Sequence, residues 1–105
     1  MVYLANAFSL QMVPGYCTIC VEDLTTEEVV KILKANDYRS IVGHADTARL
    51  LSAMLEADVE TNRVSLTLRM GDTLIVAQVL GGRLPEGCTT LPEGITIGFR
   101  RVRLV

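Results

Sequence analysis

The sequence predicts an α+β fold, close to the α/β class, in which a mixed sheet of about five strands is flanked by helices. Its 105 residues are enough for one compact core and too few for two of ordinary size. Half of the residues are apolar, and segments with strand patterns alternate with two segments of helical periodicity. We therefore treat residues 1–105 as a single domain.

The first part of the chain predicts two strands separated by an irregular stretch. Residues 2–5 are β-prone and apolar enough for a buried strand that ends near Ala7. Pro14 and Gly15 then indicate a turn, and residues 16–21 alternate as in a short strand or hairpin arm.

The next segment predicts a helix followed by a strand. Thr25 and Glu28 have the spacing of a capping box, with Thr25 as the N-cap and Glu28 reaching back to it. The apolar positions that follow favour a helix to about Ala35. Residues 38–42 are again β-like, and Gly43 ends that run.

Helical periodicity returns over residues 46–56, which we expect to pack one apolar face on the sheet. Residues 64–68 alternate apolar and polar, and the apolar run at 74–80 follows after a glycine turn. We predict that these two segments pair as a hairpin and that the second is a central strand.

The C-terminal part predicts two turns and a last strand. The sequence Leu-Pro-Glu-Gly occurs at 84–87 and again at 91–94, an echo too short to be an architectural repeat. We interpret both as turns. Residues 95–105 alternate once more, which predicts a strand at or near an edge of the sheet.

Composition narrows the classes of function. The net charge of -2 does not suit a protein that coats long nucleic acid, so we expect any phosphate site to be local. No apolar run reaches the length of a membrane span, and the N-terminus does not resemble a signal peptide, so we expect a cytoplasmic protein with no membrane partner. An odd number of cysteines predicts reduced thiols. Cys17 and Cys20 have the spacing of half a zinc or redox site, but no second pair exists, so we expect no metal and no cofactor.

His44 is the only histidine, and it falls where a strand ends and a helix begins. The first N–H groups of a helix favour an anion such as phosphate, and Gly43 allows a close approach to the backbone. A single histidine more often serves packing or capping than catalysis. Arg63, Arg83 and Glu86 lie in predicted loops from which a site can be assembled, although each alone is typical of a solvated surface.

An ordered set of segments resembles the small viral anti-CRISPR ring nucleases, a domain of unknown function found in archaeal viruses, phages and some bacteria. The segments are 3–9, 40–44, 62–64 and 83–87, together with Gln78. The resemblance implies a mixed sheet with helices, a twofold homodimer, and a cavity between the subunits that holds cyclic tetra-adenylate. It also implies that the protein destroys this messenger of type III CRISPR systems.

The same resemblance implies roles for individual residues. It identifies His44 with the catalytic histidine and Glu86 with an assisting carboxylate. It places Asn6, Ser9, Arg63 and Arg83 at ligand-contacting or loop-closing positions, and we count Gly43 with the substrate-binding residues because of the close approach that its backbone allows. After Gly87 the chain looks shorter than family members that carry a full helix there, so the cover over the ligand differs.

The expected reaction needs no metal because the substrate carries its own nucleophile, a ribose 2′-hydroxyl beside each phosphodiester. His44 would protonate the departing 5′-oxygen, a step worth about 100- to 10,000-fold. Arg63 would stabilise charge on the phosphate, and Glu86 would orient the imidazole or keep it protonated. Phe8 and Met12 are candidates for contact with adenine, with core packing as the alternative.

Three other classes of function remain open. The domain could sequester a nucleotide without cutting it. It could be a DNA-binding regulator that uses Arg100, Arg101 and Arg103. It could also be a structural or interaction domain whose apolar surplus reflects a dimer interface.

Overall fold

A computed structural model describes residues 1–88 and 90–105 as one α+β domain. In chain order its elements are β1 (Val2–Ala5), η1 (Leu10–Met12, a 3-10 helix), β2 (Ile19–Leu24), α1 (Thr26–Ala35), β3 (Tyr38–Ser40), α2 (Ala45–Leu55), β4 (Thr73–Leu80) and β5 (Thr96–Leu104).

The five strands form one mixed sheet in the order β2-β5-β4-β1-β3. β1 runs parallel to both β3 and β4, whereas β5 runs antiparallel to β4 and to β2. The predicted mixed sheet and the central position of β4 are therefore confirmed. β5 lies next to the edge strand β2 and has a partner on each side.

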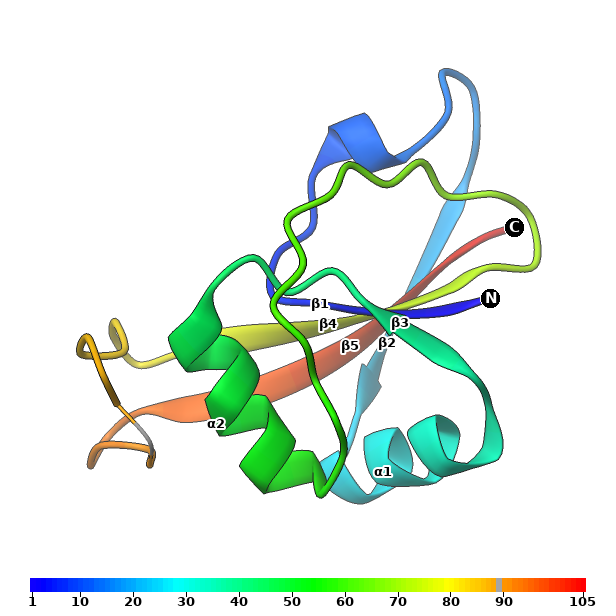
Figure 1. The fold of residues 1–105 in the computed structure, drawn as a ribbon. Coiled ribbons are helices and arrows are strands. Elements are labelled where there is room, and N and C mark those ends of the chain that lie inside the picture. Colours follow the sequence, from blue (N-terminus) through cyan, green and yellow to red (C-terminus); the bar gives the residue numbers. More distant parts are fainter. Residues whose placement is uncertain (89) are drawn as a thin grey trace.

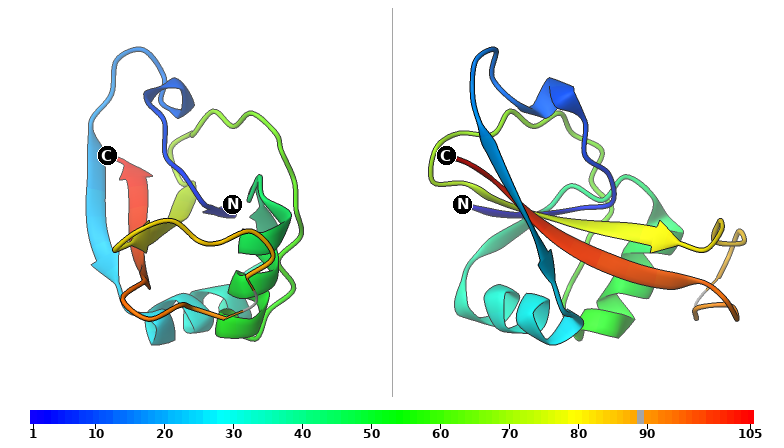
Figure 2. Two further views of the ribbon diagram at one scale, coloured as in Figure 1. Left: turned by 90° about the vertical axis from the view of Figure 1, so that its left-hand side faces the viewer. Right: turned by 180° about the vertical axis from the view of Figure 1, so that it is seen from behind.

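Both helices lie on the same face of the sheet (Figure 1), and the view from behind in Figure 2 agrees. The main core fills the space between this face and the helices. Its largest fully buried side chains come from strands and helices alike, and include Leu4, Val29, Leu51, Leu55 and Ile75. Burial of these aliphatic side chains is the principal driving force that holds α2 in place.

The opposite face is covered by irregular chain and the short 3-10 helix η1 instead of α-helices. η1 and the connection between α2 and β4 cross this face (Figures 1 and 2). A second core of buried residues lies beneath them, and it contains Ala5, Ile41, Leu68, Leu74, Val76, Val102 and Leu104. The sheet is thus buried on both sides although α-helices cover only one.

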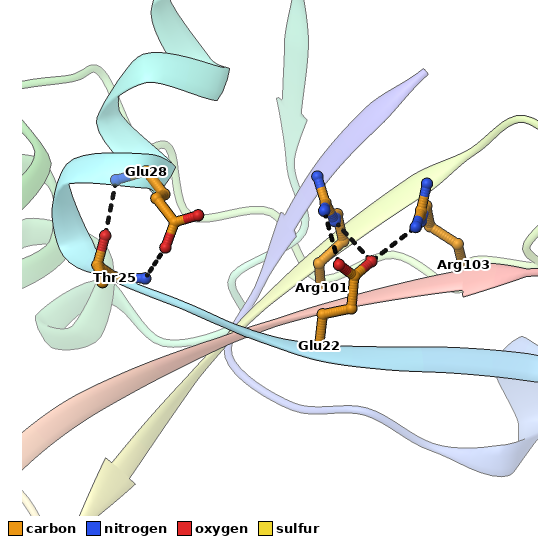
Figure 3. Close-up of polar contacts among 5 residues, drawn as sticks. All are labelled: Glu22, Thr25, Glu28, Arg101 and Arg103. Atoms are coloured by element: carbon orange, nitrogen blue, oxygen red, sulfur yellow. Dashed lines mark hydrogen bonds and ion pairs between the residues drawn. The ribbon is translucent and has the colours of Figure 1, made fainter.

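α1 begins as the sequence predicted. The hydroxyl of Thr25 accepts from the N–H of Glu28 at 3.1 Å, and the Glu28 carboxylate accepts from the N–H of Thr25 at 3.0 Å (Figure 3). This is a complete capping box, which satisfies donors that have no partner inside the helix. α2 begins one residue before the prediction and ends with Glu56 in the left-handed conformation as its C-cap.

The predicted hairpin between residues 64–68 and 74–80 is wrong. Residues 64–68 form no strand, and β4 pairs with β1 and β5 instead. The N–H of Leu68 donates to the carbonyl of Met12 at 2.7 Å, and Leu68 belongs to the second core. The alternating pattern therefore belongs to a loop whose side chains pack against the sheet but whose backbone does not pair with a strand.

Other boundaries shift by a few residues. β1 ends at Ala5 and not near Ala7, β2 begins at Ile19 and not at residue 16, and β3 ends at Ser40. Both predicted Leu-Pro-Glu-Gly turns are present, because the N–H of Cys88 donates to the carbonyl of Pro85 and that of Ile95 to Pro92.

Candidate functional site

His44 is the N-cap of α2 and is exposed. Its backbone is extended, with φ -121° and ψ 128°, and its side chain makes no capping hydrogen bond. Ala48 is the first residue of the helix whose N–H bonds back, to the carbonyl of His44 at 2.9 Å. Among the described residues, the N–H groups ahead of it in the first turn have no protein acceptor, which leaves an arrangement that favours an anion.

A cavity of about 370 Å³ opens beside this helix start. One wall is the first turn of α2, and the other is the segment after β4. The lining residues are His44, Ala45, Asp46, Thr47, Leu84, Pro85 and Glu86. The fold thus brings His44 and Glu86 to one cavity, although they are far apart in the sequence.

Asp46 joins the two walls of this cavity. Its Oδ2 accepts from the N–H of Gly87 at 2.8 Å, and its Oδ1 pairs with Arg49 one turn along α2. The Gly87 N–H, followed by the guanidinium of Arg49, lowers the pKa of the Asp46 carboxyl. Sequence reasoning missed this residue, because an acidic side chain in the first turn is ordinarily explained by the helix dipole alone.

A second cavity, of about 340 Å³, lies on the other side of the β3–α2 connection. It is lined by Asn6, Ala7, Met12, Ile41, Gly43, Arg63, Val64 and Ser65. The two cavities are adjacent along the chain, since Gly43 lines the second and His44 lines the first.

Asn6 and Arg63 both act on the backbone of Gly43. The Oδ1 of Asn6 accepts from the N–H of Gly43 at 3.2 Å. A Cβ added to Gly43 would lie 3.3 Å from Cγ of Arg63, which is a tight contact. Glycine therefore allows the stem of Arg63 to lie directly against the chain that leads into His44.

The residue before Arg63 holds this part of the chain to the sheet. The N–H of Asn62 donates to the carbonyl of Val42 at 2.8 Å, and its Nδ2 donates to the carbonyl of Ser40 at 3.0 Å. These bonds continue the edge of the sheet beyond β3. The backbone and side-chain hydrogen bonds of Asn62 therefore fix the position of Arg63, which lies in a loop as predicted.

The remaining predicted site residues are not brought into these two cavities. Ser9 is the N-cap of η1, where its hydroxyl accepts from the N–H of Gln11 at 3.3 Å. Arg83 is exposed and lines neither cavity. Of the two candidates for adenine contact, Met12 lines the second cavity, whereas Phe8 lies over β4 and β5 beside Val76 and Val102.

The whole chain resembles a family of known proteins. The profile of the family described as STIV B116-like matches residues 2–99. The chain belongs to the STIV B116-like family. B116 of Sulfolobus turreted icosahedral virus superposes with a TM-score of 0.82 at 25% identity, over 97% of each chain.

Two relatives of this B116-like protein also come from archaeal viruses. Protein 26 of a Sulfolobus islandicus filamentous virus is 34% identical over 102 residues, which covers 94% of this chain and 86% of the relative. The ORF117 protein of Acidianus two-tailed virus is 31% identical, over 92% and 86% of the two chains. The B116-like chain therefore groups with viral proteins. In the described part of the chain, neither helix has the length and apolarity to cross a membrane.

The three arginines of β5 in the B116-like protein all pair with carboxylates of β2. At the β2–β5 edge, Arg101 makes two bonds to the Glu22 carboxylate, at 3.2 and 2.9 Å, and Arg103 adds a third at 2.6 Å (Figure 3). Arg101, ahead of Arg103, lowers the pKa of Glu22.

Arg100 likewise pairs with Asp23 at 3.2 Å. Among the described residues, Arg63 and Arg83 form no ion pair with a carboxylate. Arg63, which lines the second cavity, thus keeps a guanidinium without a carboxylate partner in the described part of the chain, while the arginines of β5 pair with their neighbours on β2.

Proposed function

We propose that the protein is a metal-independent ring nuclease that cleaves cyclic tetra-adenylate to linear di-adenylates. Its biological effect would be to silence type III CRISPR signalling in the cytoplasm of the infected cell. His44 is the proposed catalytic acid, and Glu86 is its assisting carboxylate.

One observation carries the proposal. His44 and Glu86, which were assigned from the resemblance as separate residues of a site, line one cavity at the N-terminus of α2. That cavity is open, and helix N–H groups without an acceptor lie at the histidine. A proton donor, a carboxylate and an anion-favouring helix start are the groups that phosphodiester transfer needs.

The proposed reaction begins with attack of a ribose 2′-oxygen on the adjacent phosphorus. A 2′-oxygen to phosphorus bond forms, and the bond from phosphorus to the 5′-oxygen breaks. The leaving oxygen takes a proton from the His44 imidazolium, and the 2′-hydroxyl releases its own proton to water. The products carry a 2′,3′-cyclic phosphate, and the nucleophile is supplied by the substrate itself.

The neighbouring cavity supplies the proposed binding contacts. Asn6 and the stem of Arg63 hold the backbone of Gly43, and the guanidinium of Arg63 has no carboxylate partner among the described residues. Charge that grows on the phosphate oxygens would be stabilised by this guanidinium and by the start of α2. Arg83 would reach the ligand only from the exposed loop.

The proposal includes a twofold dimer. A cavity of about 370 Å³ lies at the lower end of the range for a single drug-sized ligand, and a ring of four nucleotides is larger. A twofold axis would present two copies of the cavity and two histidines to opposite phosphates of a symmetric ring. Two cuts per ring would follow.

The paired arginines favour this function over a DNA-binding regulator. Arg100, Arg101 and Arg103 are the basic cluster on which DNA binding would depend, and all three pair with carboxylates of β2. Neutralised side chains release few counterions from DNA and add little affinity.

The deciding experiment is incubation of the purified protein with radiolabelled cyclic tetra-adenylate in excess EDTA. We expect linear di-adenylates in the presence of the chelator. In the His44→Ala variant, cleavage should fall by about 100- to 10,000-fold while binding of the ring persists. Intact ring with both proteins, together with tight binding, would instead identify a sequestering module. Cleavage by both proteins at equal rates would remove His44 from the mechanism.

A further inference from the structure

The loop between β4 and β5 has two notable contacts. Its two ends meet at Gly81 and Gly94, which we call the neck, and a hydrogen bond from Gly87 to Asp46 attaches the loop to α2. At the neck, a Cβ on Gly81 would lie 2.2 Å from the carbonyl oxygen of Gly94, so the two stems are in direct contact. Among the described residues, the bond from Gly87 to Asp46 is the one hydrogen bond that joins this loop to the rest of the protein. The loop extends beyond the ends of β4 and β5 and carries Glu86 (Figure 2).

We propose that Asp46 is a positioning residue that holds the 84–87 segment against α2 and thereby sets Glu86 across the cavity from His44. The inference rests on the proposed function for its catalytic consequence. Its structural half, the anchoring of the loop, stands on the Asp46 contacts alone.

The geometry of the carboxylate suits this role. One oxygen accepts from the Gly87 backbone while the other is held by Arg49, so the side chain is fixed from both sides. Hydrogen bonds to a charged acceptor are stronger than those between neutral groups. Because the acceptor binds a backbone N–H, the contact fixes the course of the loop itself.

The hydrogen bond between Asp46 and Gly87 affects the position of Glu86 because Glu86 is the residue next to Gly87 in the chain. Adjacent Cα atoms are about 3.8 Å apart, so a shift of Gly87 moves Glu86 by nearly the same amount. A misplacement of about 1 Å can cost about 100-fold in rate. Asp46 lines the cavity, but its two carboxylate oxygens are engaged by Gly87 and Arg49, so in this proposal it makes no polar contact with the ring. Its loss should therefore lower kcat much more than it raises KM.

The first test measures how firmly the loop is held, by its susceptibility to trypsin, and does not depend on catalysis. Arg83 is exposed in the loop, and trypsin cleavage of the Arg83–Leu84 bond can be followed by mass spectrometry. Cleavage after Arg69, in the distant exposed turn before β4, serves as an internal reference. In Asp46→Ala we expect cleavage after Arg83 to be about ten-fold faster relative to Arg69. An unchanged ratio would overturn the anchoring role, whatever the activity of the variant.

The second test separates positioning from helix stability. Asp46→Ala also removes a negative charge from the first turn of α2. The matched control is Asp46→Ala combined with Ala45→Asp, which returns a carboxylate to the first turn one position away from the contact. We expect this control to recover the melting temperature of the wild type but neither its kcat nor its resistance to trypsin.

The conservative variant Asp46→Asn keeps an oxygen that can accept from Gly87. We expect it to recover most of the kcat lost in Asp46→Ala, where the loss is about 10- to 100-fold. If the double variant regains full kcat, Asp46 acts through the helix and the positioning role is wrong. If the wild type cuts no ring, the proposed function fails, and the trypsin measurement still decides whether Asp46 anchors the loop.

Discussion

The two helices of this protein begin in different ways. α1 starts with Thr25, whose hydroxyl and partner Glu28 form a complete capping box. α2 starts with His44, whose side chain caps nothing. Both helices pack on the same face of the sheet, so the contrast lies in their first turns and not in their burial.

This difference in capping indicates what each helix N-terminus contributes to the protein. At the α1 start, side chains of the helix itself cap the N–H groups of Thr25 and Glu28, and this capping adds stability. The α2 start leaves N–H groups without an acceptor and carries an exposed imidazole, an arrangement that gives up capping energy. A helix end that is locally suboptimal but lies in a cavity is where we expect function.

The strongest test of this contrast is His44→Asn. Asparagine is a favourable N-cap, so the free energy of unfolding should rise by about 0.5–1 kcal/mol. Ring cleavage should fall by about 100- to 10,000-fold, because no proton donor remains. Chemical denaturation and single-turnover cleavage measure the two effects. A less stable or fully active variant would contradict the view that His44 was retained for chemistry at the expense of capping.

We expect Arg63 and Arg83, like the start of α2, to contribute to function more than to stability. In Arg63→Ala we expect kcat for ring cleavage to fall by about 100- to 1,000-fold with little change in melting temperature. Arg83→Ala should weaken ring binding, and Arg69→Ala is the matched control, since this arginine is also exposed but lies in the turn before β4, outside the loop that carries Glu86. Equal losses in all three variants would point to a general charge effect.

The α1 start should respond in the opposite sense. Thr25→Ala removes the side-chain acceptor for Glu28 and should lower the free energy of unfolding by about 1 kcal/mol. Catalytic constants at 25 °C should stay within about two-fold of the wild type, because α1 contributes nothing to either cavity. A large kinetic effect would mean that the two helix starts are coupled.

Acid should weaken the start of α1 and the β2–β5 edge together. Backbone and side-chain hydrogen bonds from Thr25 lower the pKa of Glu28, and Arg101 lowers that of Glu22. A carboxyl whose pKa is lower in the folded state adds stability above its ordinary pKa, about 4.3 for glutamate, and loses it as pH falls further. Melting temperature should therefore be flat between about pH 7 and 5 and decline below about pH 4.

The double variant Glu22→Gln with Glu28→Gln is the control for this pH dependence. It should be slightly less stable than the wild type at neutral pH and should show a shallower decline in acid. The difference at neutral pH should shrink in high salt, because Glu28 is exposed and Glu22 is only half-buried. An identical acid profile for both proteins would assign the acid sensitivity to other carboxyls, with Asp46 the first to examine.

Local patterns predicted the helices, the central strand and the last strand well. The capping box of α1 needs only two residues three positions apart, and β4 is an apolar run long enough to indicate a buried strand. The hairpin failed because alternation reports which side chains face a core and not what the backbone bonds to. Leu66 and Leu68 do face a core, but the backbone partner of Leu68 is Met12.

The candidate site was predictable in part for a similar reason. His44 stands out as the only histidine at a predicted helix start, and the resemblance supplied Glu86. That the two line one cavity depends on contacts between distant parts of the chain. The bond from Gly87 to Asp46 joins residues 41 positions apart, and no local spacing indicates it. Ser9 likewise has an N-cap role that only the structure reveals.

The apposed glycines at the neck of the β4–β5 loop bear on how such proteins can diversify. Because Gly81 and Gly94 meet where the strands end, the sheet register is set below the loop and is independent of its length. Segments of different size could be exchanged above this point without re-pairing β4 and β5. The neck is therefore a natural place to graft longer covers onto an unchanged scaffold, and under the proposed function such covers would change which ring sizes fit.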